Sequence, residues 1–301
     1  MQPTSSSTPI AATSLSPEQV AHLQSWTGKT ESMHDLIAPQ PVAGLSATLD
    51  RDDAAPQAGD ALPPLWHWMN FLPMVRQSLL GPDGHPARGG FLPPVPLPRR
   101  MWAGGRLHWN AENPIRIGQD LERISRIASV DHKVGRSGEL LFVLVQHEYR
   151  NANGVALTEE HDIVYRAAAQ ASDPAPKPTA ADKNALWTRE INADPVMLFR
   201  YSALTANGHR IHYDRSYVTQ EEGYPGLIVH GPLIATLLID LLRRNMPDAV
   251  ITDFSFKAIR PTFDLHPFTV LGQPSEDGKT IQLWAHDHEG WLTMQGTAKV
   301  L

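Results

Sequence analysis

The sequence predicts an α+β protein in which antiparallel strands surround a buried helix. Three observations support this prediction. Residues 233–242 form an almost wholly apolar stretch with helical spacing, followed by Arg243 and Arg244 at the expected helix end. Alternating segments separated by turns follow this stretch, at 252–260, 266–272, 280–287 and 291–301. Upstream of the helix, residues 135–149 and 155–165 are typical of two long strands joined by a Gly-containing hairpin turn.

Composition limits the class of protein. The chain has 301 residues, of which 42% are hydrophobic, and this is enough for a sizeable core. Its formal net charge of −6 is not typical of a nucleic-acid-binding surface, so we expect no nucleic-acid partner. The absence of cysteine excludes disulfides and thiol nucleophiles and fits a cytoplasmic location. No apolar run reaches the roughly 20 residues of a membrane span, so we expect no membrane partner.

The first domain is expected over residues 16–166. Residues 1–15 lack the basic and apolar segments of a secretion signal and are interpreted as a flexible tail. A first helix should begin at Ser16, because the sequence Ser-Pro-Glu-Gln is typical of a capping box with Pro at the first helical position. A second short helix is expected over 41–50.

A long segment rich in Gly and Pro follows in the same domain. Residues 65–71 alternate aromatic and polar side chains, which indicates a half-buried strand or a pocket wall. Residues 81–98 hold too many Gly and Pro for a helix or a central strand, and we expect a long, packed loop. After it come Arg99, Arg100 and Arg106. A guanidinium matches a carboxylate bidentately, so one of the three is a candidate to bind a substrate carboxylate. The alternative is a solvated loop with structural ion pairs.

The remaining strands of the first domain are expected at 107–117, 120–132, 135–149 and 155–165. Residues 167–184 are rich in Ala and Pro and poor in large apolar side chains, which is typical of a linker between domains. The second domain should then cover 185–301 and open with a strand at 186–191.

Side chains capable of chemistry gather before the apolar helix. A polar turn contains Asn207, His209, Arg210, His212 and Asp214. Further along, His230-Gly231-Pro232 leads into the helix, with Pro232 expected at the first helical position and Gly231 as the N-cap. Backbone N–H groups at a helix start can stabilise an anion or an oxyanion, although the same turn could simply begin a core helix.

The stretch 207–214, Asn-Gly-His-Arg-Ile-His-Tyr-Asp, resembles the motif of the MaoC-like (R)-specific enoyl-thioester hydratases. The longer string RYSALTANGHRIHYD resembles a two-domain branch of that family. This branch includes mesaconyl-C4-CoA (3-methylfumaryl-CoA) hydratases, itaconyl-CoA hydratases and type 2 hydroxyacyl-thioester dehydratases. The resemblance implies a double hot-dog fold, in which each antiparallel sheet wraps a central helix and the N-terminal copy is degenerate.

The resemblance also implies roles for individual residues. His212 falls on the catalytic histidine of the family, and the N–H of Gly231 would polarise the thioester carbonyl. The family's catalytic aspartate is replaced by Asn207, and an amide cannot act as a base. His212 should therefore carry more of the proton transfer while Asn207 orients the water. Alternatively, His209 or Asp214 supplies the second group.

Further contacts with the substrate are expected from other side chains. The candidate substrate-binding residues are Arg99, Arg100, Arg106, Tyr201, His209 and His230. Lys257 and Arg260 are candidates for the CoA phosphates, although surface ion pairs are the alternative interpretation. Two histidines three residues apart are a weak metal signal without a third ligand at a recognisable spacing, so we expect neither a metal nor a redox cofactor.

The resemblance implies reversible hydration of an α,β-unsaturated C5 dicarboxylic acyl-CoA to citramalyl-CoA. The substrate would be mesaconyl-C4-CoA or itaconyl-CoA, and His212 would titrate into activity near neutral pH. Three alternatives stay open: a dehydratase of straight-chain 3-hydroxyacyl thioesters, a hot-dog thioesterase, and a non-catalytic acyl-CoA binding protein. The edges of hot-dog sheets also allow a homodimer.

Overall fold

The computed structural model describes residues 14–86, 88–135, 138–167 and 177–301. Most of the expected tail (1–15) and half of the expected linker (167–184) therefore lie outside the described residues. The strands of the first half are β1 (Thr30–Leu36), β2 (Arg99–Trp109), β3 (Asp120–Gly135), β4 (Gly138–Asn151) and β5 (Gly154–Arg166). Those of the second half are β6 (Trp187–Ile191), β7 (Ile251–Ala258), β8 (Phe268–Pro274), β9 (Thr280–His286) and β10 (Leu292–Val300).

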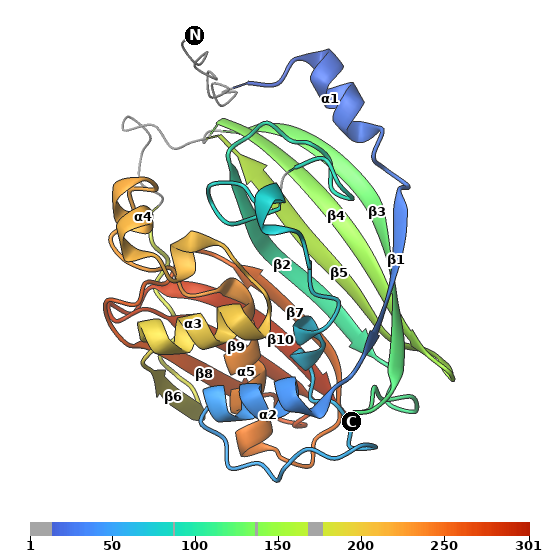
Figure 1. Ribbon diagram of the computed structural model, residues 1–301. Helices are drawn as coiled ribbons and strands as arrows, with labels where there is room; N and C mark the ends of the chain where they lie inside the picture. The colour runs from blue at the N-terminus through green and yellow to red at the C-terminus, as the bar shows by residue number, and fades with distance from the viewer. Residues whose placement is uncertain (1–13, 87, 136–137, 168–176) are drawn as a thin grey trace.

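These strands form one antiparallel sheet in the order β1-β3-β4-β5-β2-β7-β10-β9-β8-β6. Strands of the first half make up one side of the sheet and those of the second half the other (Figure 1). The two sides join where β2 pairs with β7. Gly104 and Gly105 lie at this junction, and a Cβ at either position would crowd the Phe256 carbonyl or ring. The expected α+β class is therefore confirmed.

The α-helices are α1 (Pro17–Gln24), α2 (Pro39–Thr48), α3 (Pro195–Leu204), α4 (Arg215–Gln220) and α5 (Gly231–Asn245). Short 3₁₀ helices are η1 (Trp66–Met69), η2 (Gln77–Leu79) and η3 (Arg210–His212). α5 packs against β6, β8, β9 and β10, and every residue from Leu233 to Leu242 is buried. None of the described helices is long and apolar enough to cross a membrane.

The main core joins the two halves of the chain. Leu45 of α2 and Leu198 of α3 belong to the same buried cluster as Leu238 of α5. Asp240 of α5, whose side chain is fully buried, pairs with Arg51, Arg189 and Arg244 at 2.6–2.8 Å. A buried carboxylate needs such partners because its desolvation is costly. The three arginines tie α5 to β6 and to the segment that follows α2.

The Gly- and Pro-rich segment packs against the far end of the first-half strands, as expected. Val95 and Leu97 are fully buried there, in a second core cluster with Leu23 of α1. Arg88 fastens the segment, because its guanidinium donates to the carbonyl oxygens of Val95, Leu97 and Pro98.

Several sequence expectations need correction. Residues 65–71 contain the buried helix η1 instead of a strand, flanked by Leu65 and Phe71 with positive φ. β2 begins at Arg99 and ends at Trp109, so the arginines lie in a strand and 110–117 does not. β1, α3 and α4 were not foreseen. α5 has His230 as its N-cap, so it begins one residue earlier than expected, at Gly231.

Candidate active site

The site is built around the beginning of α5. The first N–H groups of a helix have no acceptor within the helix. Gly231 supplies the first of these groups, and a Cβ placed on it would meet no atom within 4 Å. The backbone therefore borders open space on the side where a side chain would stand.

His212 lies beside this helix start. It ends η3, and its ring stacks on that of His230 with centroids 3.7 Å apart and an interplanar angle of 17°. Its Nδ1 lies 2.7 Å from the carbonyl oxygen of Ile228. A carbonyl only accepts hydrogen bonds, so Nδ1 carries the proton and Nε2 keeps a free lone pair. His212 is thus held in the tautomer that a base requires.

Burial lowers the pKa of His212 to about 4, against the opposing effect of its hydrogen bond to Ile228. The side chain lies inside the protein, where the charged form loses its hydration. The expectation that His212 titrates near neutral pH is therefore corrected: the imidazole is neutral there and already able to accept a proton.

The His212 ring packs against His230, which in turn contacts Tyr201. Nε2 of His230 lies 2.8 Å from the hydroxyl of Ser202, and the Tyr201 ring meets the His230 ring edge to face at 5.0 Å. His230 is fully buried, and its Nδ1 has no hydrogen-bond partner among the described residues. Buried polar atoms are usually satisfied, so this unpaired ring nitrogen is unusual.

Asn207 and Asp214 have local roles. The side-chain oxygen of Asn207 accepts the His209 N–H at 3.1 Å and shapes the turn. Asp214 caps α4 through the Tyr217 N–H and pairs with Arg210 at 2.7 Å. Its carboxylate is therefore already occupied, which disfavours Asp214 as the second proton-transfer group.

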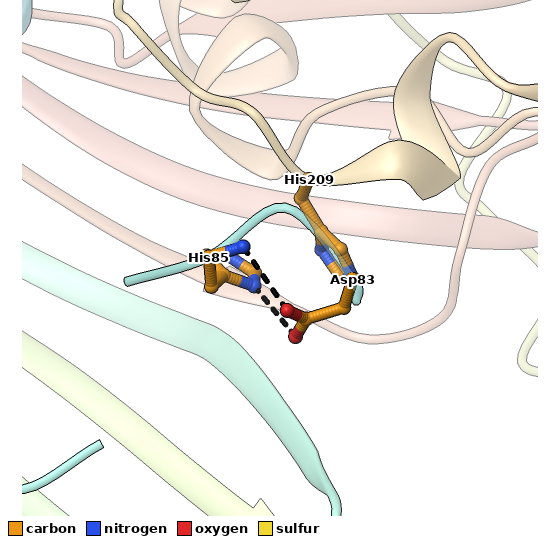
Figure 2. A group of neighbouring side chains, drawn as sticks. All are labelled: Asp83, His85 and His209. Atoms are coloured by element: carbon orange, nitrogen blue, oxygen red, sulfur yellow. Dashed lines mark hydrogen bonds and ion pairs between the residues drawn. The ribbon is translucent and has the colours of Figure 1, made fainter. Parts of the chain in front are cut away.

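A loop from the first half of the chain reaches this turn. Potential ligand atoms of Asp83, His85 and His209 lie within 4.8 Å of one another (Figure 2). The His85 ring is 4.2 Å from the His209 ring, which is 5.6 Å from that of His212. A metal ion would find two imidazoles and a carboxylate here, which no sequence spacing indicated. The group includes His209 but not His212. Asp83 and His85 could not be predicted as part of this site, because their loop is distant from His209 in the sequence.

The candidate basic residues do not all lie on the same side of the sheet. Leu107 and Phe256 face the core shared with α5, and side chains alternate along strands, so Arg106 and Lys257 face the opposite side of the sheet. Arg106 is bound there by Glu160 and Asp162. The structure therefore does not bring Arg106 or Lys257 to the histidines, and the ion-pair alternative describes Arg106.

Arg100 and Arg88 both act on His85, and Arg100 also acts on His209. Burial is the main cause that lowers the pKa values of His85 and His209, and the charge of Arg100 lowers both further. Arg99 lies over the Tyr224 ring at 5.3 Å. Arg260 lies beyond β7, with Nη1 3.5 Å from an oxygen of Asp287. Among the four candidate arginines, Arg100 is thus the one whose charge acts on both His85 and His209.

A neutral buried histidine in η3, beside the start of a helix that packs on a sheet shared by both halves of the chain, fits a hydratase or dehydratase of the MaoC-like class. The sequence matches the family model of hydroxyacyl-thioester dehydratase type 2 over residues 65–264. It is 44% identical to mesaconyl-C(4)-CoA hydratase of Chloroflexus aurantiacus over 283 residues, which cover 93% of this chain and 98% of that protein. The chain therefore belongs to the hydroxyacyl-thioester dehydratase type 2 family, as its motif indicated, and is an enzyme.

Solved structures agree on the fold. A MaoC-like dehydratase from Phytophthora capsici has a TM-score of 0.67 and 13% identity, with 94% of this chain and 97% of that chain covered. A Mycobacterium tuberculosis protein described as a double hot-dog has a TM-score of 0.56 and 12% identity, with 91% of this chain and 94% of that chain covered. The predicted double hot-dog fold is thereby confirmed.

The depressed pKa of His212 predicts how activity depends on pH. His212 must be neutral to accept a proton, and its pKa is lowered to about 4. We expect kcat/KM to be unaffected by His212 from pH 8 to 6 and to fall as pH approaches about 4, where the imidazole becomes protonated. Initial rates in buffers of constant ionic strength would measure this, with circular dichroism to confirm folding. An acid limb centred near 6.5 in the folded enzyme would contradict the neutral, buried state.

Proposed function

We propose that the enzyme adds water across the double bond of an α,β-unsaturated C5 dicarboxylic acyl-CoA, with mesaconyl-C4-CoA as the first candidate and citramalyl-CoA as the product. The observation that carries this proposal is the free Nε2 of His212, whose ring stacks on that of His230, the residue before Gly231 at the start of α5. The name of the relative that is 44% identical supports the choice of acyl group.

The reaction needs an oxyanion donor and a base. The thioester oxygen would accept the Gly231 N–H, which stabilises the enolate; losing one such donor typically raises a barrier by about 3–4 kcal/mol. Nε2 of His212 accepts a proton of the water as the C–O bond forms at the β-carbon and the π pair moves toward the α-carbon. The resulting imidazolium returns this proton to the α-carbon, so one water is added in total.

A C5 dicarboxylic substrate brings a free carboxylate into the site. Arg100 is the candidate partner, because its charge reaches His85 and His209 while Arg106 is occupied on the other face of the sheet. A guanidinium matches a carboxylate in a bidentate geometry. The second candidate function is dehydration of 3-hydroxyacyl thioesters, which the matched family's name favours and which uses the same groups in reverse.

Substitution of His212 tests the proposed reaction. We expect native protein to hydrate mesaconyl-C4-CoA faster than crotonyl-CoA, and His212→Ala and His212→Gln to lower kcat by about 10²–10⁴-fold. Loss of the enoyl-thioester absorbance measures turnover, and a thiol reagent reports any release of free CoA. His34→Ala, an exposed histidine on β1, is the control.

Other outcomes of this assay would favour other functions. Faster turnover of crotonyl-CoA would favour the fatty-acyl dehydratase, and CoA release would indicate a thioesterase. Tight binding of acyl-CoA without turnover in the native protein would indicate a binding protein.

Two arginines test the carboxylate contact. Arg100→Gln should raise KM for mesaconyl-C4-CoA by at least about 10-fold, because a charged hydrogen-bond partner is worth roughly 1.5–3 kcal/mol, and should change KM for crotonyl-CoA much less. Arg106→Gln removes the same charge from the outer face and should leave both values close to native. Steady-state kinetics on the two substrates measures the difference. Equal effects of the two variants would rule out Arg100 as the carboxylate partner.

A further inference from the structure

Residues 81–86 form a loop that packs directly on the turn preceding His212. Gly84 has φ +87°, and a Cβ on it would lie 1.9 Å from the carbonyl oxygen of Gly208. A Cβ on Gly208 would in turn lie 2.8 Å from the carbonyl oxygen of Gly84. Real Cβ contacts are never this short, so only glycine at both positions lets the two backbones touch.

Hydrogen bonds fix the loop in this place. The N–H of Arg210 donates to the carbonyl oxygen of Asp83 at 2.9 Å, and its guanidinium donates to that of Pro82 at 3.0 Å. Within the loop, the Gly81 N–H donates to the His85 carbonyl at 2.7 Å. The segment that carries His212 therefore also sets the position of Asp83 and His85.

Asp83 holds His85 in a defined tautomer. One carboxylate oxygen accepts the His85 backbone N–H at 3.0 Å, and the other lies 3.1 Å from its Nδ1 (Figure 2). Although burial opposes it, these hydrogen bonds hold the pKa of Asp83 below its usual range, so the carboxylate is ionised. An ionised carboxylate only accepts, so Nδ1 of His85 carries the proton and Nε2 is free. His212 has the same tautomer.

The His85 and His212 imidazoles lie near the same turn, and they come from the two different halves of the chain. His209 contacts both rings, at 4.2 Å from His85 and 5.6 Å from His212. Asp214 cannot compete for the role of second group because Arg210 and the start of α4 occupy it.

We propose that His85 is a second catalytic residue, which binds the attacking water together with His212, and that Asp83 is its positioning residue. This rests on the proposed function. Nε2 of His85 accepts a hydrogen bond from the O–H that the water keeps, while Nε2 of His212 takes the other proton. The oxygen attacks the β-carbon, and the His212 imidazolium returns the proton to the α-carbon. The product hydroxyl keeps its hydrogen, bonded to His85.

Asp83 acts in this scheme through His85. Its carboxylate keeps the proton on Nδ1, as the aspartate of a catalytic triad does for its histidine, so that Nε2 can only accept. The fixed Nε2 orients the lone pair of the water toward the β-carbon. A misplacement of about 1 Å can cost roughly 10²-fold in rate, which sets the expected size of the effect.

Variants of the loop test the proposal. His85→Ala and Asp83→Asn should lower kcat for mesaconyl-C4-CoA by about 10²-fold with a smaller change in KM. Added imidazole should restore part of the turnover of His85→Ala, which a purely structural defect would not allow. His34→Ala, an exposed histidine, should behave as native protein with and without imidazole. Melting temperatures identify any variant that fails to fold, and His85→Gln, which keeps a polar side chain, is the second variant for that case.

The two glycines test the position of the loop. Gly84→Ala and Gly59→Ala both place alanine at positive φ, but a Cβ on Gly59 meets no atom within 4 Å. Gly84→Ala should lower kcat as the His85 variants do, whereas Gly59→Ala should affect stability alone. Equal kcat values in the two glycine variants would show that the position of the loop 81–86 does not affect catalysis.

Three results would overturn the proposal. Native kcat in Asp83→Asn and His85→Ala, with inactive His212→Ala, would reject the role of His85 and leave the proposed function intact. Loss of activity with EDTA and its recovery with Zn²⁺ would show that Asp83, His85 and His209 hold a metal instead. Absence of enoyl-CoA turnover in native protein would reject the proposed function and this proposal together.

Discussion

The structure depends on the burial of one helix that has almost no polar face. All residues from Leu233 to Leu242 in α5 are buried, so the helix must be covered on every side. Strands of the second half cover one side, and α2 and α3 contribute to the same core. The first N–H groups of the buried helix cannot be satisfied within it. A helix enclosed in this way therefore leaves its N-terminus, beside His212, as the place where a polar ligand is favoured.

The first half of the chain contributes to this place as well as to the sheet. Its loop 81–86 touches the turn before His212 through two glycines and brings Asp83 and His85 to His209. A carboxylate, that of Asp83, thus reaches the turn that has Asn207 in place of an aspartate, from a segment far away in the sequence. Joining the two sides of the sheet through β2 and β7 makes this contact possible.

Local patterns predicted most of the fold and part of the site. The apolar helix and the long strands were visible from periodicity, and the motif around His212 indicated the family. β1, with the polar sequence TESMHDL and four of its seven residues exposed, has no apolar alternation to reveal it. The convergence of Asp83 with His209 could not be read from spacing, because it depends on strand order. Gly84 and Gly208 were the remaining signal, since a glycine in each of two polar turns permits close backbone contact.

The electrostatic properties of the site also could not be predicted from local sequence patterns. The sequence does not show that burial lowers the pKa of His212, nor that Arg106 faces away from the core while Arg100 acts on the histidines. The most direct test is a crystal structure of the His212→Gln variant with mesaconyl-C4-CoA. We predict the thioester oxygen at about 2.7–3.1 Å from the Gly231 nitrogen, with the free carboxylate at Arg100. An acyl group bound on the outer face, near Arg106 and Lys257, would contradict the location of the active site.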